Sequence, residues 1–256
     1  MIAADILARY DADIRQDPPP EPGVKHERIG NIVRAVGRYN CILFSDLSRG
    51  DADVDAVIAE QVAFFRASGS DAEWKVYGHD LPADLGRRLG AAGFVADEPE
   101  TLMAFDLEDD LPVGRLPSRV SLRRVFDERG LADLVAVTAA TSGRETWMFH
   151  AFGSRLLDPT LGLYVAYADD KPIAAGRLEM PANRLFAGLW GGCTLPAFRR
   201  RGIFRAIVAA RAQEARRRGY RFLSVDARET SRTTLERLGF VALTGVTGWI
   251  LKAAQP

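Results

Sequence analysis

Apolar residues recur along this chain with two spacings, about two residues in short runs and about 3.6 residues in longer ones, which predicts a mixture of strands and helices. The elements expected in the first half are a helix at 2–15, strands at 32–38 and 39–47, a helix at 51–67, a strand at 72–78, a helix at 81–93 and a strand at 101–107. Turn-forming residues such as the DPPPEPG segment at 17–23 separate these elements.

The second half shows the same two spacings. Its expected elements are a strand at 120–125, a helix at 127–143, a hairpin at 161–180, a strand at 184–194, a helix beginning after the arginines at 199–201, a strand at 222–227, a helix at 231–239 and a strand at 240–251. The hairpin is expected to turn between Asp169 and Pro172, where charged residues and a proline separate two apolar runs. Both halves therefore mix strands with helices.

A break in both spacings at 108–120, where acidic residues, two prolines and a glycine occur close together, predicts a domain boundary. The expected domains are 1–112 and 118–256. The two domains resemble each other near their ends, because 93–96 and 239–242 both read Gly-Phe-Val-Ala and both lie before a last strand. The chain is therefore predicted to contain two copies of one unit, of which only the second has a glycine after an arginine run.

Composition and charge narrow the class of protein. With 47% hydrophobic and 27% charged residues among 256, the chain has the balance of a packed globular protein. Lysine plus arginine (34) equals aspartate plus glutamate (34), so no basic excess favours a nucleic-acid partner. Cys41 and Cys193 lie far apart and give neither a metal-binding spacing nor a disulfide framework. Because no apolar run approaches the ~20 residues of a membrane span and the N-terminus lacks a signal-peptide core, we expect a cytoplasmic protein without membrane or metal.

The most unusual local feature is a cluster of arginines directly before an expected helix. Three consecutive arginines at 199–201 precede Gly202, and Arg205 follows. A helix start presents free N–H groups and the positive end of the helix dipole, so it repels cations and attracts an anion such as phosphate. A phosphate site would explain the cluster, with a solvated basic turn as the alternative. The arginines at 216–218 lie at the other end of the helix, where cations suit the dipole, and are expected to be surface residues.

The order of elements around this cluster resembles a known family. An apolar strand, Thr194-Leu195-Pro196, the run RRRGIF, a long helix, the strand FLSVDA and the segment LERLGF together resemble the GNAT superfamily of acyl-CoA-dependent N-acyltransferases. The resemblance covers about 118–252 and, more loosely, the first half, and it is similar more narrowly to two-domain predicted acetyltransferases. It implies an α+β (mixed α/β) fold of tandem GNAT-like domains, each a mostly antiparallel twisted sheet flanked by helices, with a degenerate N-terminal copy.

The same resemblance implies acetyl-CoA as co-substrate. The backbone at 192–194 would pair with the pantetheine arm, and backbone N–H groups at 200–205 would hold the pyrophosphate. The residues assigned to the cofactor in this way are Gly192, Cys193, Thr194, Arg199, Arg200, Arg201, Gly202, Ile203, Phe204, Arg205 and Arg228. This chain departs from the family pattern at three places. Phe204 replaces a second small residue, Arg228 replaces a frequent asparagine, and Leu235 replaces the tyrosine that usually protonates the leaving thiolate.

Acyl transfer to an amine requires a deprotonated amine, a polarised thioester carbonyl and a released thiolate. Glu179 is the candidate general base, with a solvated edge-strand carboxylate as the alternative. Ser231 is the candidate for orienting the thiol, with helix N-capping as the alternative. His150 has an intrinsic pKa suited to proton transfer, and Trp190 and Trp147 are candidates for lining the acceptor pocket; a structural role is the alternative for all three.

These features predict an N-acetyltransferase that transfers an acetyl or other small acyl group from acetyl-CoA to an amine of a small molecule or peptide by direct attack. The alternative is an acyl-CoA-binding sensor or regulatory module that lost catalysis together with the tyrosine. The expected partners are the amine acceptor and, at most, a second copy of the chain, since either a monomer or a homodimer fits the sequence. No nucleic-acid partner is expected.

Overall fold

The protein is described here by a computed structural model that covers residues 2–48, 53–112, 116–142 and 146–253. By the clustering of Cα positions the chain forms two compact units. Unit 1 comprises Met1–Met103, Asp226–Arg232 and Ala242–Pro256, and unit 2 comprises Ala104–Val225 and Thr233–Val241. The limits 1–112 and 118–256 stay a prediction about the domains.

Unit 1 is built on a mixed sheet in the order β1-β2-β3-β4-β12, with β5 also paired to β12. Its strands are β1 (Val24–Ile29), β2 (Ile32–Gly37), β3 (Cys41–Ser45), β4 (Ala72–Tyr77), β5 (Val95–Ala96) and β12 (Val241–Leu251). All of these pairs are antiparallel except β3 with β4. Its helices are α1 (Ala3–Tyr10) with a π-helical continuation (Asp11–Arg15), α2 (Val54–Ser68) and α3 (Leu85–Ala91). Strand β6 (Glu100–Asp106) runs through the point at which the two units divide.

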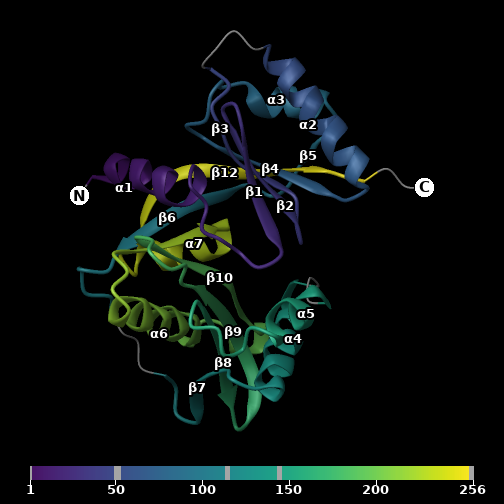
Figure 1. Cartoon of the computed structure of the whole chain (residues 1–256). Coiled ribbons are helices and arrows are strands. Elements are labelled where there is room, and N and C mark those ends of the chain that lie inside the picture. Colours follow the sequence, from purple (N-terminus) through teal and green to yellow (C-terminus); the bar gives the residue numbers. More distant parts are fainter. Residues whose placement is uncertain (1, 49–52, 113–115, 143–145, 254–256) are drawn as a thin grey trace. The chain divides into compact units, whose positions relative to one another are not determined.

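The main core of unit 1 lies between one face of β4 and the helices α2 and α3, which lie beside each other in Figure 1. Successive strand residues point to opposite faces, so Ala72 and Trp74 face this core while Lys75 and Tyr77 face the other way. Trp74 is fully buried and its indole Nε1 donates to the Ser45 hydroxyl at 3.2 Å. On the opposite face, the Tyr10 ring of α1 packs against Tyr77.

A buried ion pair anchors the end of the N-terminal helix to unit 1. The guanidinium of Arg15 donates to both carboxylate oxygens of Asp80, at 2.8 and 2.7 Å. It also lies 3.8 Å from the centre of the Tyr77 ring and donates through Nε to the Leu43 carbonyl. The Arg15 and Asp80 side chains are only 2% and 3% exposed, so removing one charge would leave the other buried without its main partner.

Unit 2 is built on strands in the order β11-β10-β9-β8-β7. These are β7 (Val120–Arg124), β8 (Leu161–Ala168), β9 (Lys171–Glu179), β10 (Phe186–Thr194) and β11 (Phe222–Ala227), antiparallel except for β10 with β11. Its helices are α4 (Glu128–Ser142), α5 (Thr146–Gly153) and α6 (Ile203–Arg217), and α7 (Glu229–Glu236) contributes its second half. Figure 1 shows α6 on one side of β8–β10 and α4 with α5 on the other.

The backbone confirms one predicted turn and shows one strand that the sequence pattern missed. The β8–β9 hairpin turns at Asp169 and Asp170, whose φ values of 47° and 62° are those of a two-residue hairpin turn. The strand β1 was missed, because its VKHERI sequence is mostly polar and it is recognised only by its ladder with β2. None of the described helices is long and apolar enough to cross a membrane.

The two Gly-Phe-Val-Ala segments end their helices in the same way. Gly93 and Gly239 have φ values of 98° and 94°. In each case the N–H of the following phenylalanine, Phe94 or Phe240, donates to the carbonyl of a leucine five residues earlier, at 3.0 Å. This is the hydrogen bond of a glycine-terminated helix. The duplication of the unit stays a prediction that this local likeness favours.

We expect Asp80→Asn to lower the free energy of unfolding by about 3 kcal/mol, the low end for a broken buried pair, because Arg15 keeps only Asp11, at 2.7 Å, as a carboxylate partner. Urea unfolding followed by circular dichroism measures the change. Lys252→Gln is the control, since the Lys252–Asp71 pair is 74% and 52% exposed and its loss should cost less than about 1 kcal/mol. Equal effects of the two substitutions would contradict the role given to the buried pair.

Candidate active site

The first element of the site is the edge of β10, which separates from β11 partway along. The recorded ladder joins Phe186–Gly188 to Phe222–Ser224 and ends there. On its other side β10 stays paired to β9 as far as Thr194. Within the described part of unit 2, Leu189 and the residues after it therefore have no partner on β11. Their backbone donors and acceptors are available to an extended ligand, which can bind as an added strand.

A β-bulge interrupts β10 at the same place. Trp190 pairs with Arg177 and Cys193 pairs with Ala175, so Gly191 and Gly192 stand opposite the single residue Gly176. Gly191 has a φ of 57°, which a glycine adopts without strain. Both bulge glycines are exposed, whereas Cys193 is half-buried and Thr194 is buried. The predicted cofactor segment 192–194 therefore begins inside the bulge.

The second element is the start of α6. After a short 3₁₀ turn, Arg200 and Gly202 both have left-handed backbones, with φ values of 61° and 79°, and the helix begins at Ile203. The Gly202 carbonyl accepts from Ala206 N–H at 3.0 Å, and no side chain caps the helix. The N–H groups of the first helical residues have no acceptor within the helix, so this end is suited to an anion.

The arginines in and beside this turn fall into three groups according to the contacts that their side chains make. Arg199 donates from Nε to the Thr194 carbonyl at 3.1 Å, so it fastens the end of β10. The Arg201 guanidinium lies 5.4 Å from the centre of the Phe198 ring. Arg200 and Arg205 are exposed, and neither forms a hydrogen bond or an ion pair with the described residues. Two of the four arginine side chains are therefore free to contact a ligand.

Phe204 fits the turn because Gly192 has no side chain. A Cβ atom added at Gly192 would lie 3.0 Å from Cε2 of the Phe204 ring. The bulky residue that replaces the family's second small residue is thus accommodated by a glycine on the neighbouring strand. Ile203, the residue before it, is buried and packs into unit 2.

Glu179 and Trp190 both lie beside the guanidinium of Arg177. The carboxylate of Glu179, at the end of β9, contacts Nε of Arg177 at 3.0 Å, and its side chain is 33% exposed. The guanidinium of Arg177 lies 5.8 Å from the Trp190 ring and 4.9 Å from the Phe152 ring. The base candidate is therefore an ion-paired carboxylate beside the proposed acceptor aromatic, rather than a carboxylate in open solvent.

The remaining candidates are not brought to this place within unit 2. Arg228 and Ser231 belong to the segment 226–232 of unit 1, where Arg228 lies 3.5 Å from Glu100 and 3.7 Å from Glu98. Ser231 is the third residue of α7 and its hydroxyl donates to the Arg228 carbonyl at 3.0 Å, so the N-cap alternative is wrong. His150 is exposed on α5, and the side chain of Trp147 lies outside the described residues.

Leu235 has no side-chain proton to donate. Its side chain is 1% exposed at the end of α7. Its carbonyl accepts from Leu238 and Phe240 as part of the helix end. A hydrocarbon side chain therefore occupies the position at which the family resemblance implied a tyrosine.

Sequence reasoning missed two arginines on the buried side of this site, Arg177 and Arg211. Arg211 lies four residues after Ile207 and four before Ala215, on the stripe of α6 that faces the sheet. A charged residue at that spacing in an apolar stripe was the available signal. Arg211 is 1% exposed and its guanidinium lies against the β10 bulge.

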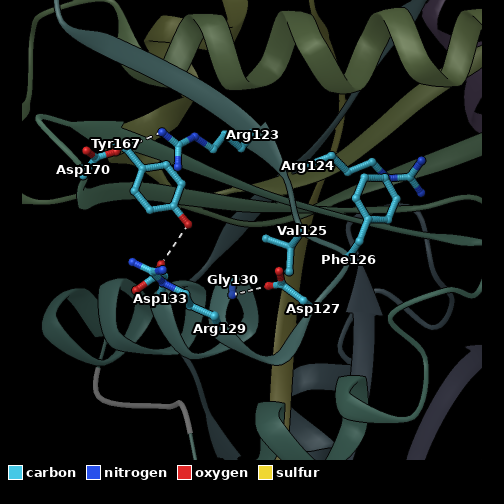
Figure 2. A pocket seen from close by; sticks show the side chains of 10 residues that line it. All are labelled: Arg123, Arg124, Val125, Phe126, Asp127, Arg129, Gly130, Asp133, Tyr167 and Asp170. Atoms are coloured by element: carbon cyan, nitrogen blue, oxygen red, sulfur yellow. Dashed lines mark hydrogen bonds and ion pairs between the residues drawn. The ribbon is translucent and has the colours of Figure 1, made fainter.

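A hollow of about 500 Å³ lies elsewhere in unit 2, between β7, β8 and the first turn of α4 (Figure 2). Several of its polar side chains already contact other groups of the protein. Arg123 contacts Asp170 at 3.0 Å, and the Tyr167 hydroxyl donates to Asp133 at 2.9 Å. The Asp127 carboxylate accepts from Gly130 N–H near the start of α4. Neither β10 nor the start of α6 lines this hollow, and we assign no part of the site to it.

Within the described ranges, no group of three or more His, Cys, Asp or Glu side chains is arranged to hold a metal ion.

Comparison with known proteins matches part of the chain to one family. Residues 131–240 match the model of the Acetyltransferase (GNAT) family. The chain therefore contains a GNAT-family domain, which includes the β10 edge and the start of α6. No curated protein sequence matches this chain significantly.

Solved structures of the same fold cover nearly the whole chain. A GCN5-related N-acetyltransferase from Kribbella flavida is 16% identical with a TM-score of 0.71, and the match covers 99% of this chain and 96% of that one. A tandem GNAT protein from the clavulanic acid biosynthesis pathway is 14% identical with a TM-score of 0.63 and coverages of 93% and 86%. A GCN5-related N-acetyltransferase from Sphaerobacter thermophilus is 15% identical with a TM-score of 0.62 and coverages of 98% and 94%. These likenesses confirm the predicted fold class, a mixed α/β fold with mostly antiparallel strands flanked by helices.

Gly202→Val should lower the free energy of unfolding by about 1–2 kcal/mol, because a β-branched residue is strained at a φ of 79°. Gly202→Asn is the matched control, since asparagine tolerates the left-handed region and should cost less than half as much. Thermal unfolding of both variants without ligand gives the comparison. If valine and asparagine are equally tolerated, the turn does not need the left-handed backbone.

Proposed function

We propose that the protein is an N-acetyltransferase that moves an acetyl, or another small acyl, group from acetyl-CoA to an amine of a small molecule or peptide. One observation carries the proposal: the unpaired edge of β10 is followed, within one short turn, by a helix start with unpartnered N–H groups. An extended chain that ends in phosphates matches both features. Coenzyme A has that construction, with a pantetheine arm and a pyrophosphate. The GNAT-family match over 131–240 supports the same ligand.

The residues present fit this co-substrate. The backbone of Gly192, Cys193 and Thr194 would pair with the amide groups of the pantetheine arm. The N–H groups of the first turn of α6 would bind the pyrophosphate, with the side chains of Arg200 and Arg205 adding charge-assisted contacts. Arg199 and Arg201 contribute less, because their guanidinium groups already contact Thr194 and Phe198.

In the proposed reaction the amine nitrogen attacks the thioester carbonyl carbon. A carbon–nitrogen bond forms, the carbon–sulfur bond breaks, and its electron pair leaves on sulfur as a thiolate. The amine loses one proton, which we assign to the carboxylate of Glu179 directly or through water. The Arg177 guanidinium contacts this carboxylate at 3.0 Å and thereby holds its position. With leucine at 235, we propose that the thiolate takes its proton from solvent.

The acceptor is proposed to bind near Trp190. This tryptophan is half-buried and contacts Arg177, the residue that also holds Glu179. A flat aromatic beside a carboxylate suits an amine that carries an apolar or ring-shaped portion.

Cys41 and Cys193 are both free thiols, which supports the expectation of a reducing, cytoplasmic compartment.

Arg200→Gln and Arg205→Gln should each weaken coenzyme A binding about 5-fold, and the remaining affinity should depend less on salt. The reason is the loss of one charge-assisted contact to phosphate, about 1 kcal/mol. Isothermal titration with coenzyme A at two salt concentrations measures both effects. Arg217→Gln is the control, because Arg217 is an exposed arginine at the far end of the same helix. Affinities unchanged in all three variants would remove the phosphate assignment.

Acetyl-CoA mixed with a panel of primary amines should release free thiol at a rate that depends on the amine. Glu179→Gln should lower kcat by about 10²-fold, the usual contribution of a general base, and leave coenzyme A affinity unchanged. A thiol-reactive dye follows the release. Tight binding of acetyl-CoA with no thiol release for any amine would contradict the enzyme and favour an acyl-CoA-binding sensor.

A further inference from the structure

Arg211 is the most deeply buried charge among the described residues of unit 2. It lies in the middle of α6, on the face that packs against β9 and β10, and is 1% exposed. Its Nη1 donates to the Arg177 carbonyl at 2.9 Å and, over a longer 3.4 Å, to the Trp190 carbonyl. Its Nε donates to the Ile207 carbonyl at 3.2 Å. Every one of these acceptors is a backbone carbonyl.

No carboxylate neutralises this guanidinium among the described residues. Glu214, one turn further along α6, is buried but is occupied by Arg124 and Arg218, each at 2.7 Å, and by the Tyr164 hydroxyl. A charge buried in this way costs stability unless its hydrogen bonds or a function compensate. Arg211 therefore needs an explanation beyond packing.

The guanidinium occupies a slot that glycines make on two neighbouring strands. A Cβ atom added at Gly176 would lie 3.1 Å from Cζ of Arg211 and 2.9 Å from Cγ2 of Ile207. One added at Gly192 would lie 3.4 Å from Nη2 of Arg211. Gly192 belongs to the β10 bulge, and Gly176 is the residue opposite the bulge on β9. The side chain of Arg211 therefore fills the space beside the bulge from the α6 side.

The contact with Trp190 also sets the direction of the next N–H group. The peptide between Trp190 and Gly191 is not among the cis bonds, so its carbonyl and its N–H point in opposite directions. Because the carbonyl is turned toward Arg211 on the α6 side, the Gly191 N–H is turned away from it. Gly191 is exposed, and an added Cβ there would meet nothing within 4 Å. A ligand at the β10 edge can therefore approach Gly191 without meeting a side chain.

We propose that Arg211 is a positioning residue for acyl transfer, which holds the β10 bulge so that the Gly191 N–H faces the acyl carbonyl and supplies positive charge beneath it. The inference rests on the proposed function, since the acyl group is the one assigned to this edge above. Negative charge develops on the carbonyl oxygen and then on the sulfur during the transfer. A fixed donor and a buried cation stabilise that charge more in the transition state than in the ground state. This would lessen the need for a proton donor at Leu235.

The charge persists at neutral pH. Burial lowers the pKa of the Arg211 guanidinium to about 10, while Tyr164 and Cys193 oppose the shift and Arg177 adds to it. A pKa at this value leaves the group protonated throughout the physiological range.

The first test uses the free protein and does not depend on turnover. Arg211→Lys keeps the charge but loses the fork of donors that reaches two carbonyls. Amide resonances of isotope-labelled protein should shift at Gly191 and Gly192 in this variant, and the Gly191 amide should lose its fixed orientation. Arg216→Lys is the matched control, because Arg216 lies in the same helix and also donates to a backbone carbonyl, that of Leu107. Bulge resonances that are unchanged in Arg211→Lys, or that shift equally in Arg216→Lys, would overturn the proposal.

The second test is kinetic. Arg211→Lys should lower kcat by about 10–100-fold, less than the ~10²–10³-fold cost of removing an oxyanion donor itself, while the Kd for coenzyme A stays within about 2-fold. Arg211→Gln, in which the charge is also lost, should lower kcat further with the same Kd. A folded Arg211→Lys with unchanged kcat, or with kcat and affinity reduced together, would overturn the positioning role. If the unaltered protein releases no thiol, the proposed function fails, and the resonance test still decides the role of Arg211 in the bulge.

Discussion

The separation of β10 from β11 after Gly188 is the constraint on which the site depends. A paired strand would use its donors and acceptors within the sheet, and only the loss of pairing makes them available to a ligand. The bulge at Gly191 and Gly192 comes next along the strand. The chain then turns through Arg200 and Gly202 into α6. Backbone edge, bulge and helix start are therefore consecutive parts of one segment. Side chains contribute mainly by keeping that backbone in place.

The buried charges of the two units have different surroundings. In unit 1, Arg15 is matched by Asp80, and Lys75 contacts the carboxylate of Asp226. Such pairs fix the position of elements when both partners are present. In unit 2, Arg211 donates only to backbone carbonyls and lies against the bulge. Within the described part of unit 2, a buried charge without a carboxylate thus lies against the bulge, where we propose that negative charge develops.

The sequence predicted the fold class correctly, whereas the cofactor segment and the catalytic groups stay predictions. Elements with strong spacing, such as the β8–β9 hairpin and α6, were found because local pattern and tertiary packing agree. The strand β1 was missed because its polar residues are held by pairing with β2, a non-local interaction. The contacts of Arg199 with Thr194 and of Phe204 with Gly192 depend on how a strand and a helix approach each other, which spacing along the chain does not specify. Arg211 was overlooked for the same reason, although its place in an apolar stripe was visible.

A structure of the protein with coenzyme A tests the central claim most directly. The account predicts electron density for the pyrophosphate at the N–H groups of the first turn of α6, with the pantetheine arm alongside Gly192, Cys193 and Thr194. Density in the hollow beside Arg123 and Tyr167, with none at the start of α6, would contradict it.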